Sequence, residues 1–214
     1  LGINSAYLVS FTILIASVYA LTRDDLKARL AYSTVSQLSY ILLGALLLSP
    51  SGKLGGLYHM ASHGVAKITL FFCAGAILVA TNKTLISDMT GLGRQMPFTM
   101  VAFFIGSLTI IGLPPAAGLW SKWYLLQGAM TAEQWLLILV LAFSSILNIF
   151  YLLPIPIRAF FSPAAAITVK PPVNRVPTSM VLSIAFSSTV CLVLFFLPES
   201  LFQLAQAILI RSGQ

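Results

Sequence analysis

The sequence predicts an all-α, polytopic membrane protein with about six transmembrane helices, one of them discontinuous. Of its 214 residues, 58% are hydrophobic and only 8% are charged, and the mean hydropathy is +0.96, which excludes most soluble domains. The apolar residues form runs of about 20, the length that crosses a hydrocarbon core of roughly 30 Å. The connections between the runs are too short for a soluble domain.

Five crossings are uninterrupted, and we expect them over residues 2–21, 30–48, 57–80, 135–157 and 178–197. An interfacial helix with a thin polar face is expected over residues 201–210. Because the sequence starts at Leu1 and enters an apolar run almost at once, we expect it to belong to a longer polypeptide.

The stretch 98–132 is too long for one straight helix and contains Gly112-Leu113-Pro114-Pro115. Two consecutive prolines remove backbone donors and disfavour a continuous helix, so the stretch is either a hairpin or one broken crossing. We predict a broken crossing from the distribution of charge, because basic residues concentrate in loops on the cytoplasmic side. Irregular backbone at membrane depth needs protein or water around it, which indicates an ion pathway.

With one broken crossing, eight loop bases lie on one side and only Lys53 and Arg211 lie on the other; a hairpin would divide them six to four. The eight are Arg23, Lys27, Arg29, Lys83, Arg94, Arg158, Lys170 and Arg175. We therefore expect an inner (plasma) membrane protein with cytoplasmic loops near 22–29, 82–97 and 158–177. The formal charge of +7 is explained in this way, and no nucleic-acid partner is expected.

His59, His63 and Lys67 recur at intervals of four residues within a predicted span. This spacing places them on one helix face, about 6 Å apart along the axis. A charged group at the bilayer centre costs roughly 3 kcal/mol, so an intramembrane lysine indicates function, and imidazoles beside it can relay protons. The alternatives are two hydrogen-bonded core or headgroup histidines, and a zinc site, which lacks a third ligand and would be repelled by Lys67.

Lys122 follows the predicted break by one to two helical turns. Carbonyl groups freed by a broken helix can solvate an ammonium group, which makes Lys122 a second candidate for proton transfer. The alternative is that Lys122 snorkels to the headgroups between Trp120 and Trp123.

Polar residues also recur at helical spacing on two neighbouring spans. This pattern is equally compatible with helix packing and with side chains that line a water-filled path. They are Ser33, Ser36, Gln37, Tyr40 and Gly44 in one span and Ser144, Asn148 and Tyr151 in the other. None of the five acidic residues lies in the middle of a span. A carboxylate partner for the lysines is therefore expected from another part of the protein or from another subunit.

The segment Asp25-Leu26-Lys27-Ala28-Arg29-Leu30-Ala31-Tyr32-Ser33-Thr34-Val35-Ser36-Gln37 resembles the signature of the antiporter-like subunits of respiratory complex I, membrane-bound hydrogenases and Mrp-type cation/proton antiporters. The resemblance continues through the His59–Lys67 helix and through residues 112–123, and it covers about 1–160. Relatives usually have adjacent Lys and Arg after the Asp, whereas Ala28 separates Lys27 from Arg29 here. The form Ser121-Lys122-Trp123 most resembles the D-type subunit of Mrp antiporters.

The resemblance implies two inverted five-helix repeats, of which residues 1–160 would be the second, with residues 161–214 adding a loop, one helix and a tail. It implies that Lys122 is the broken-helix lysine of a proton half-channel, that Lys67 with His59 and His63 is the central relay, and that Asp25 and Lys27 form the cytoplasmic end of the route. An exposed ion pair of little energetic value is equally compatible with Asp25 and Lys27.

We therefore expect a proton-translocating subunit of a Mrp-type Na⁺/H⁺ antiporter. Its proton path would be supported by Ser33, Gln37, Tyr40, Ser144 and Asn148, and its partners would be other membrane subunits, protons, Na⁺ and lipid. The alternatives are the equivalent subunit of an NADH:quinone oxidoreductase or hydrogenase, and a structural scaffold. The chain contains no flavin, iron–sulfur or nucleotide motif, so we expect no cofactor and no metal.

Overall fold

The computed structural model describes residues 2–162 and 175–211, and throughout this part the chain is helical, with one isolated bridge between Asp25 and Leu85. The helices are α1 (Gly2–Thr22), α2 (Leu26–Leu46), α3 (Pro50–Thr81), α4 (Pro97–Ile111), α5 (Gly118–Thr131), α6 (Trp135–Leu152), α7 (Pro154–Phe161), α8 (Thr178–Phe196) and α9 (Glu199–Arg211), with 3₁₀ turns η1 (Ile86–Met89) and η2 (Leu92–Arg94). The predicted all-α class is confirmed.

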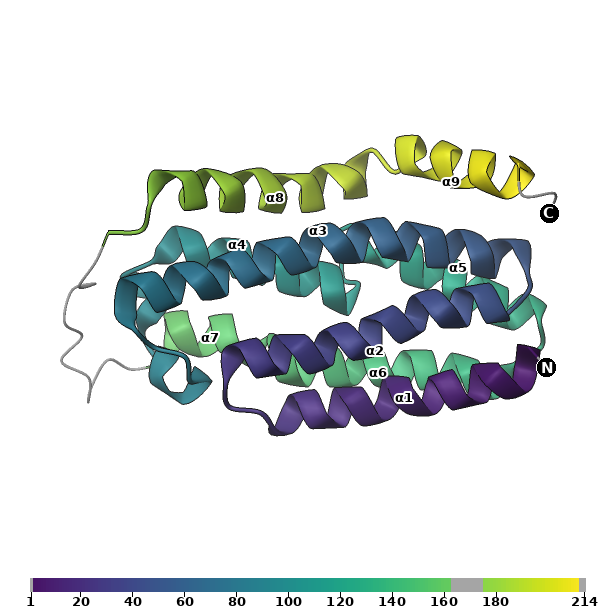
Figure 1. Ribbon diagram of the computed structural model, residues 1–214, viewed down its shortest axis with the longest axis horizontal. Helices are drawn as coiled ribbons and strands as arrows, with labels where there is room; N and C mark the ends of the chain where they lie inside the picture. Colours follow the sequence, from purple (N-terminus) through teal and green to yellow (C-terminus); the bar gives the residue numbers. More distant parts are fainter. Residues whose placement is uncertain (1, 163–174, 212–214) are drawn as a thin grey trace.

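The long helices lie side by side and alternate in direction (Figure 1). Within the described part of the chain, four stretches are long and apolar enough to cross a membrane: Ile3–Thr22, Pro50–Thr81, Trp135–Phe161 and Thr178–Phe196. The α2 helix and the α4–α5 pair run along the same axis beside them. Because α5 continues in the direction of α4, the stretch 98–132 is one traverse with a break and not a hairpin.

Helix α3 is the centre of the bundle, since α2, α4, α5 and α8 all pack against it. It is 32 residues long and begins at Pro50, well before the predicted start at residue 57. Ser49 caps it by accepting a hydrogen bond from the backbone N–H of Gly52, and proline at the first helical position is preorganised for a helix. The cap and the proline therefore extend α3 beyond its apolar run.

Helix α2 likewise begins earlier than predicted, at Leu26, because the carboxylate of Asp25 accepts a hydrogen bond from the N–H of Ala28 at 2.8 Å. The predicted helix 135–157 is divided into α6 and α7, with Leu153 between them. Pro154 and Pro156 each lack the N–H that continues the helical ladder, which accounts for the interruption.

One end of the bundle holds most of the loop bases. Here Leu26 N donates to Thr84 O at 2.9 Å, Gly91 N donates to Arg158 O at 3.4 Å, and the Arg29 guanidinium donates to Tyr151 O at 3.1 Å. Lys53 lies at the opposite end, beside α9. Of the eight bases assigned to one side, Lys170 lies outside the described residues, as does most of the predicted loop 158–177.

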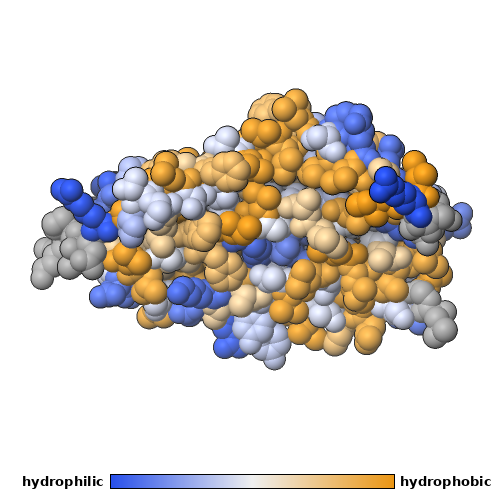
Figure 2. All heavy atoms as spheres, turned by 45° about the horizontal axis from the view of Figure 1, so that its top comes forward, coloured by the Kyte–Doolittle hydropathy of each residue, from blue (hydrophilic) through white to orange (hydrophobic). Residues whose placement is uncertain are grey.

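The visible flank of the bundle is predominantly apolar, and hydrophilic residues gather toward both ends, along the lower edge and in a small group near the middle of this face (Figure 2). Large apolar side chains such as Leu8, Phe143 and Phe186 are more than half exposed. A soluble protein rarely exposes such an extensive apolar surface, whereas a protein surrounded by lipid requires one.

Candidate functional site: two buried lysines

Lys67 lies near the middle of α3, and only 7% of its surface is exposed. Its Nζ donates two hydrogen bonds of 2.9 Å, to Leu30 O and to Ser33 Oγ, both in α2. The Ser33 side chain is fully buried. The ammonium group is therefore held by neutral oxygens between two packed helices.

Lys122 lies in the first turns of α5 and is likewise 7% exposed. Its Nζ donates to Ile111 O at 2.8 Å and to Ser145 Oγ at 3.0 Å. Ile111 is the last residue of α4, so its carbonyl is one that the helix break leaves without an intrahelical partner. With Oδ1 of Asn148 turned toward Lys122, this oxygen lies 3.1 Å from Nζ.

The break itself depends on close backbone contact. Gly112 has a φ of 85°, in the left-handed region, and a Cβ there would lie 2.7 Å from Lys122 Cδ. At Gly118, a Cβ would lie 1.8 Å from the carbonyl oxygen of Thr109. Only glycine fits at these two positions, and together they bring the start of α5 against the end of α4.

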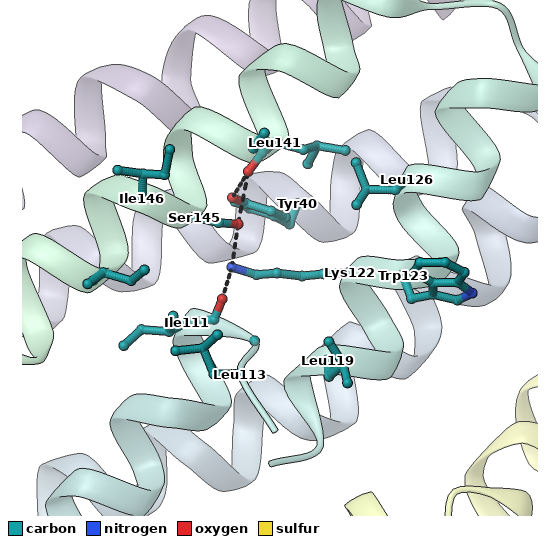
Figure 3. Close-up of a pocket in the computed structure, with 13 residues that line it drawn as sticks. Tyr40, Ile111, Leu113, Leu119, Lys122, Trp123, Leu126, Leu141, Ser145 and Ile146 are labelled. Carbon is teal, nitrogen blue, oxygen red and sulfur yellow. Dashed lines mark hydrogen bonds between the residues drawn. The ribbon is translucent and has the colours of Figure 1, made fainter. Parts of the chain in front are cut away.

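Figure 3 shows Lys122 extending from α5 across a cavity of about 240 Å³ toward the end of α4 and toward α6. The walls are mainly apolar and include Leu126 and Ile146, and the Lys122 Nζ lies 5.1 Å from the centre of the Tyr40 ring. Because Nζ is bound to Ile111 and Ser145, Lys122 does not reach outward in the way the snorkelling alternative requires.

His59 and His63 lie on the same face of α3, as the spacing predicted, and their rings stack with centroids 5.8 Å apart. The His59 ring also stacks on Tyr40 at 5.3 Å, and its Nδ1 is 2.9 Å from Ser121 Oγ. Within the described residues, three buried polar atoms have no hydrogen-bond partner: His59 Nε2, His63 Nδ1 and Gln37 Oε1. These orphaned atoms are unusual in a packed interior and mark a polar region between α2 and α3.

The two polar stripes on α2 and α6 divide between packing and the lysine sites. Ser144 Oγ lies 3.3 Å from Ser17 Oγ, which lies 2.9 Å from Ser36 Oγ, so these three hydroxyls join α1, α2 and α6. Farther along α6, Asn148 and Tyr151 are fully buried beside the lysines. The Tyr151 hydroxyl donates to Ser33 Oγ at 3.0 Å.

Asp25 and Lys27 lie apart from this network, at the basic end of the bundle. The Asp25 carboxylate caps α2, and the Lys27 side chain is exposed. The other acidic residues also lie at or between helix ends: Asp24 before α2, Asp88 in η1, Glu133 between α5 and α6, and Glu199 at the start of α9. Among the residues that the structure describes, no carboxylate therefore lies at either lysine site.

Sequence reasoning missed Ser145 and the two backbone acceptors, Leu30 O and Ile111 O. Ser145 follows Ser144 directly, but only the packing of α6 against the break shows that it meets Lys122. No cluster of three or more His, Cys, Asp or Glu side chains suited to a metal ion occurs among residues 2–162 and 175–211.

Comparisons with known proteins show the family to which this chain belongs. Residues 4–148 match the family described as "NADH:quinone oxidoreductase/Mrp antiporter, TM". NADH-quinone oxidoreductase subunit N of Desulforudis audaxviator is 42% identical over 139 residues, which cover 65% of this chain and 28% of that protein. Subunit L of Campylobacter jejuni is 37% identical over 161 residues, covering 74% of this chain and 26% of that protein.

Among solved structures, a chain of the Mrp complex from Dietzia sp. DQ12-45-1b superposes with a TM-score of 0.85 at 25% identity, covering 94% of this chain and 45% of that one. The chain thus spans less than a third of the curated relatives and less than half of this structural one. The family match over residues 4–148 includes both lysines and the broken helix. This chain therefore belongs to the NADH:quinone oxidoreductase/Mrp antiporter family of membrane subunits.

Proposed function

We propose that this chain forms the proton-conducting part of an ion-translocating membrane complex. The observation that carries the proposal is the pair of lysines, Lys67 and Lys122, each buried in the bundle and held by neutral oxygens alone. A static structural role does not require such costly groups, since apolar side chains would pack at lower cost. A buried lysine without a counter-charge releases its proton more readily than an exposed one, which proton transfer requires.

In this proposal, Lys67 and Lys122 bind the proton, and His59 and His63 form part of the relay between them. Gln37 contributes a buried oxygen without a hydrogen-bond partner, Tyr40 packs against His59 and Lys122, and Ser144 supports α6. Asp25 and Lys27 would act at the entrance from the basic end. Residues 1–160 would form one repeat of an inverted pair, and residues 161–214 an appended helix and tail.

For the coupled reaction, we favour exchange of a monovalent cation such as Na⁺ in a Mrp-type antiporter. Two observations support this choice: the Ser121-Lys122-Trp123 motif and the similarity to a chain of the Dietzia Mrp complex. The partners would be other membrane subunits of the complex in the inner membrane. The loops near 22–29, 82–97 and 158–177 would face the cytoplasm, in keeping with their basic residues.

The second candidate is a redox-driven proton pump. It is favoured by the curated relatives, which are named NADH-quinone oxidoreductase subunits N and L and NAD(P)H-quinone oxidoreductase chain 5. In that case electron transfer would take place in other subunits, and this chain would contribute the same lysine pair.

The lysine proposal is tested in the full-length protein, assembled in its complex and placed in sealed vesicles. We expect Lys67→Ala and Lys122→Ala each to abolish proton movement measured with a pH-sensitive dye. Lys83→Ala is the matched control, because Lys83 is only partly buried and its Nζ donates to Asp88 O at the basic end. Unchanged transport in both buried-lysine variants would refute the proposal and leave a scaffold role.

The coupled reaction is tested in the same vesicles. A pH gradient that collapses on addition of Na⁺, without an electron donor, supports the antiporter. A gradient that forms only when NADH and quinone are supplied supports the redox-driven pump.

A further inference from the structure

A continuous hydrogen-bonded connection links the two buried lysines through α6. With the Asn148 amide oriented so that Oδ1 faces Lys122, this oxygen lies 3.1 Å from Lys122 Nζ, and Asn148 Nδ2 lies 2.7 Å from the Tyr151 hydroxyl. Tyr151 donates to Ser33 Oγ at 3.0 Å, and Ser33 Oγ accepts from Lys67 Nζ at 2.9 Å. Asn148, Tyr151 and Ser33 are all fully buried. The connection consists of protein groups at ordinary hydrogen-bond distances throughout.

The histidine face of α3 does not provide an equivalent connection. His59 is bonded to Ser121, and one ring nitrogen of each histidine has no partner within the described residues. The direct link between the lysines therefore runs through Asn148 and Tyr151 of α6. Neither of these side chains binds an additional proton at neutral pH.

The geometry points to Asn148 and Tyr151 as positioning residues that make the charge of one lysine depend on the charge of the other. This inference rests on the proposed function and deepens it. The Asn148 amide is the switching element, because its two ends differ: one is an acceptor and the other a donor.

In one orientation of the amide, Oδ1 accepts from Lys122 and from Gln37 Nε2, both at 3.1 Å, and Nδ2 donates to Tyr151. Tyr151 then donates to Ser33. Ser33 Oγ then accepts from both Tyr151 and Lys67, so its acceptor capacity is shared between them. This orientation therefore favours a charged Lys122 and offers Lys67 only a shared acceptor.

In the opposite orientation, the Tyr151 hydroxyl donates to Asn148 Oδ1 at 2.7 Å. The Nδ2 group then faces Lys122, where it suits a neutral amine and opposes an ammonium group. A charged Lys67 donates to Ser33, which can donate onward to Tyr151. Each orientation of Asn148 thus favours charge on one lysine, and rotation of the amide accompanies transfer of charge between them.

Other titratable and charged groups surround this connection, and a test has to keep them unchanged. They are His59 and His63 of α3, Tyr40 of α2, and Arg29, which donates to the backbone oxygen of Tyr151.

The principal test is Tyr151→Phe in the full-length protein within its complex, with transport measured in vesicles across a range of pH. We expect transport to fall about tenfold, the size of a typical coupling between sites, and its pH profile to change because the lysines then titrate independently. Tyr58→Phe is the matched control: Tyr58 is also buried, but its hydroxyl donates to Leu194 O, away from the lysines.

Asn148→Leu should reproduce the loss, and the double variant should lose no more than either single variant, because both changes break one connection. If either variant fails to assemble, 3-fluorotyrosine at position 151 keeps the ring and the hydroxyl and alters only the hydroxyl's acidity. We expect it to shift the pH profile of transport.

A Tyr151→Phe protein with the wild-type rate and pH profile, or a fluorinated protein with an unshifted profile, would overturn the inference. If Lys67→Ala still abolished transport, the proposed function would stand without it. If neither lysine variant affected transport, the proposed function would fail first.

Discussion

The surroundings of the two buried lysines differ in construction, although both side chains are 7% exposed. Lys67 belongs to a continuous helix and takes its oxygens from an intact neighbour, α2, through Leu30 O and the Ser33 side chain. Lys122 follows a helix break and takes a carbonyl oxygen, Ile111 O, that the break has released. A cavity of about 240 Å³ lies beside Lys122.

The comparison shows two ways to hold an ammonium group away from water. The Lys67 site lies between two intact helices and should respond mainly to loss of the Ser33 hydroxyl, its one side-chain acceptor. The Lys122 site also depends on the geometry of the helix break and should respond most to changes at the glycines of the break. The following variants test this distinction.

Gly118→Ala should have the largest effect. Its Cβ would lie 1.8 Å from Thr109 O, and a backbone carbonyl within a helix cannot move away without shifting α4. We expect a loss of stability at or above the upper end of the roughly 1–3 kcal/mol of an overpacked core, measured by thermal unfolding in detergent. Gly64→Ala is the control, because no atom lies within 4 Å of its Cβ position. Equal melting temperatures for the two variants would show that the break tolerates rearrangement.

Gly112→Ala should cause a moderate loss of stability and a specific loss of transport. Its φ of 85° costs alanine about 1–2 kcal/mol, and its Cβ would also displace Lys122. Gly91→Ala carries the same kind of backbone strain, with a φ of 76° and no atom within 4 Å. We expect similar losses of stability in both variants but a loss of transport only in Gly112→Ala. A comparable loss in Gly91→Ala would indicate strain alone.

Ser33→Ala should reduce transport more than Ser145→Ala. Ser33 accepts hydrogen bonds from both Lys67 and Tyr151, whereas Ser145 is one of three oxygens around Lys122. A hydrogen bond to a charged group contributes roughly 1.5–3 kcal/mol. Ser39→Ala, which removes only a bond to Val35 O, is the control in the same vesicle measurement. The distinction between the sites fails if Ser145→Ala is the more severe change.

The smallest effect is expected at Tyr40. Its hydroxyl makes a long contact of 3.4 Å with Leu141 O, so Tyr40→Phe should transport protons at nearly the wild-type rate. Tyr40→Leu also removes the ring from beside Lys122, at a cost of roughly 1 kcal/mol or about a fivefold change in rate. If Tyr40→Phe were as impaired as Tyr40→Leu, the hydroxyl and not the ring would be the important group.

Much of the fold could be predicted because the thickness of the bilayer sets the length of each crossing helix and requires it to be apolar. The broken crossing followed from Gly112 and the two prolines, and its single direction followed from the loop charges. The early start of α3 was missed because a capped first turn needs no apolar residues. The interruption at Leu153 was missed because apolarity alone continued to residue 157.

For the site, helical periodicity predicted the shared face of His59 and His63, and the cost of buried charge singled out Lys67 and Lys122. The oxygens that hold the lysines could not be predicted, since they depend on how far α2, α4 and α6 are shifted along the central helix. The link through Tyr151 requires distances between three helices, which a single sequence does not contain.

The position of Lys67 near the middle of α3 also has an electrical consequence. Under the proposed function, a proton that reaches this residue from one face of the membrane would cross about half of the transmembrane voltage. Since a full crossing is worth about 2.3 kcal/mol per 100 mV, half is worth about 1.2 kcal/mol. Each 100 mV would then change the occupancy ratio of this lysine by roughly sevenfold, so the membrane voltage itself would bias where the proton resides.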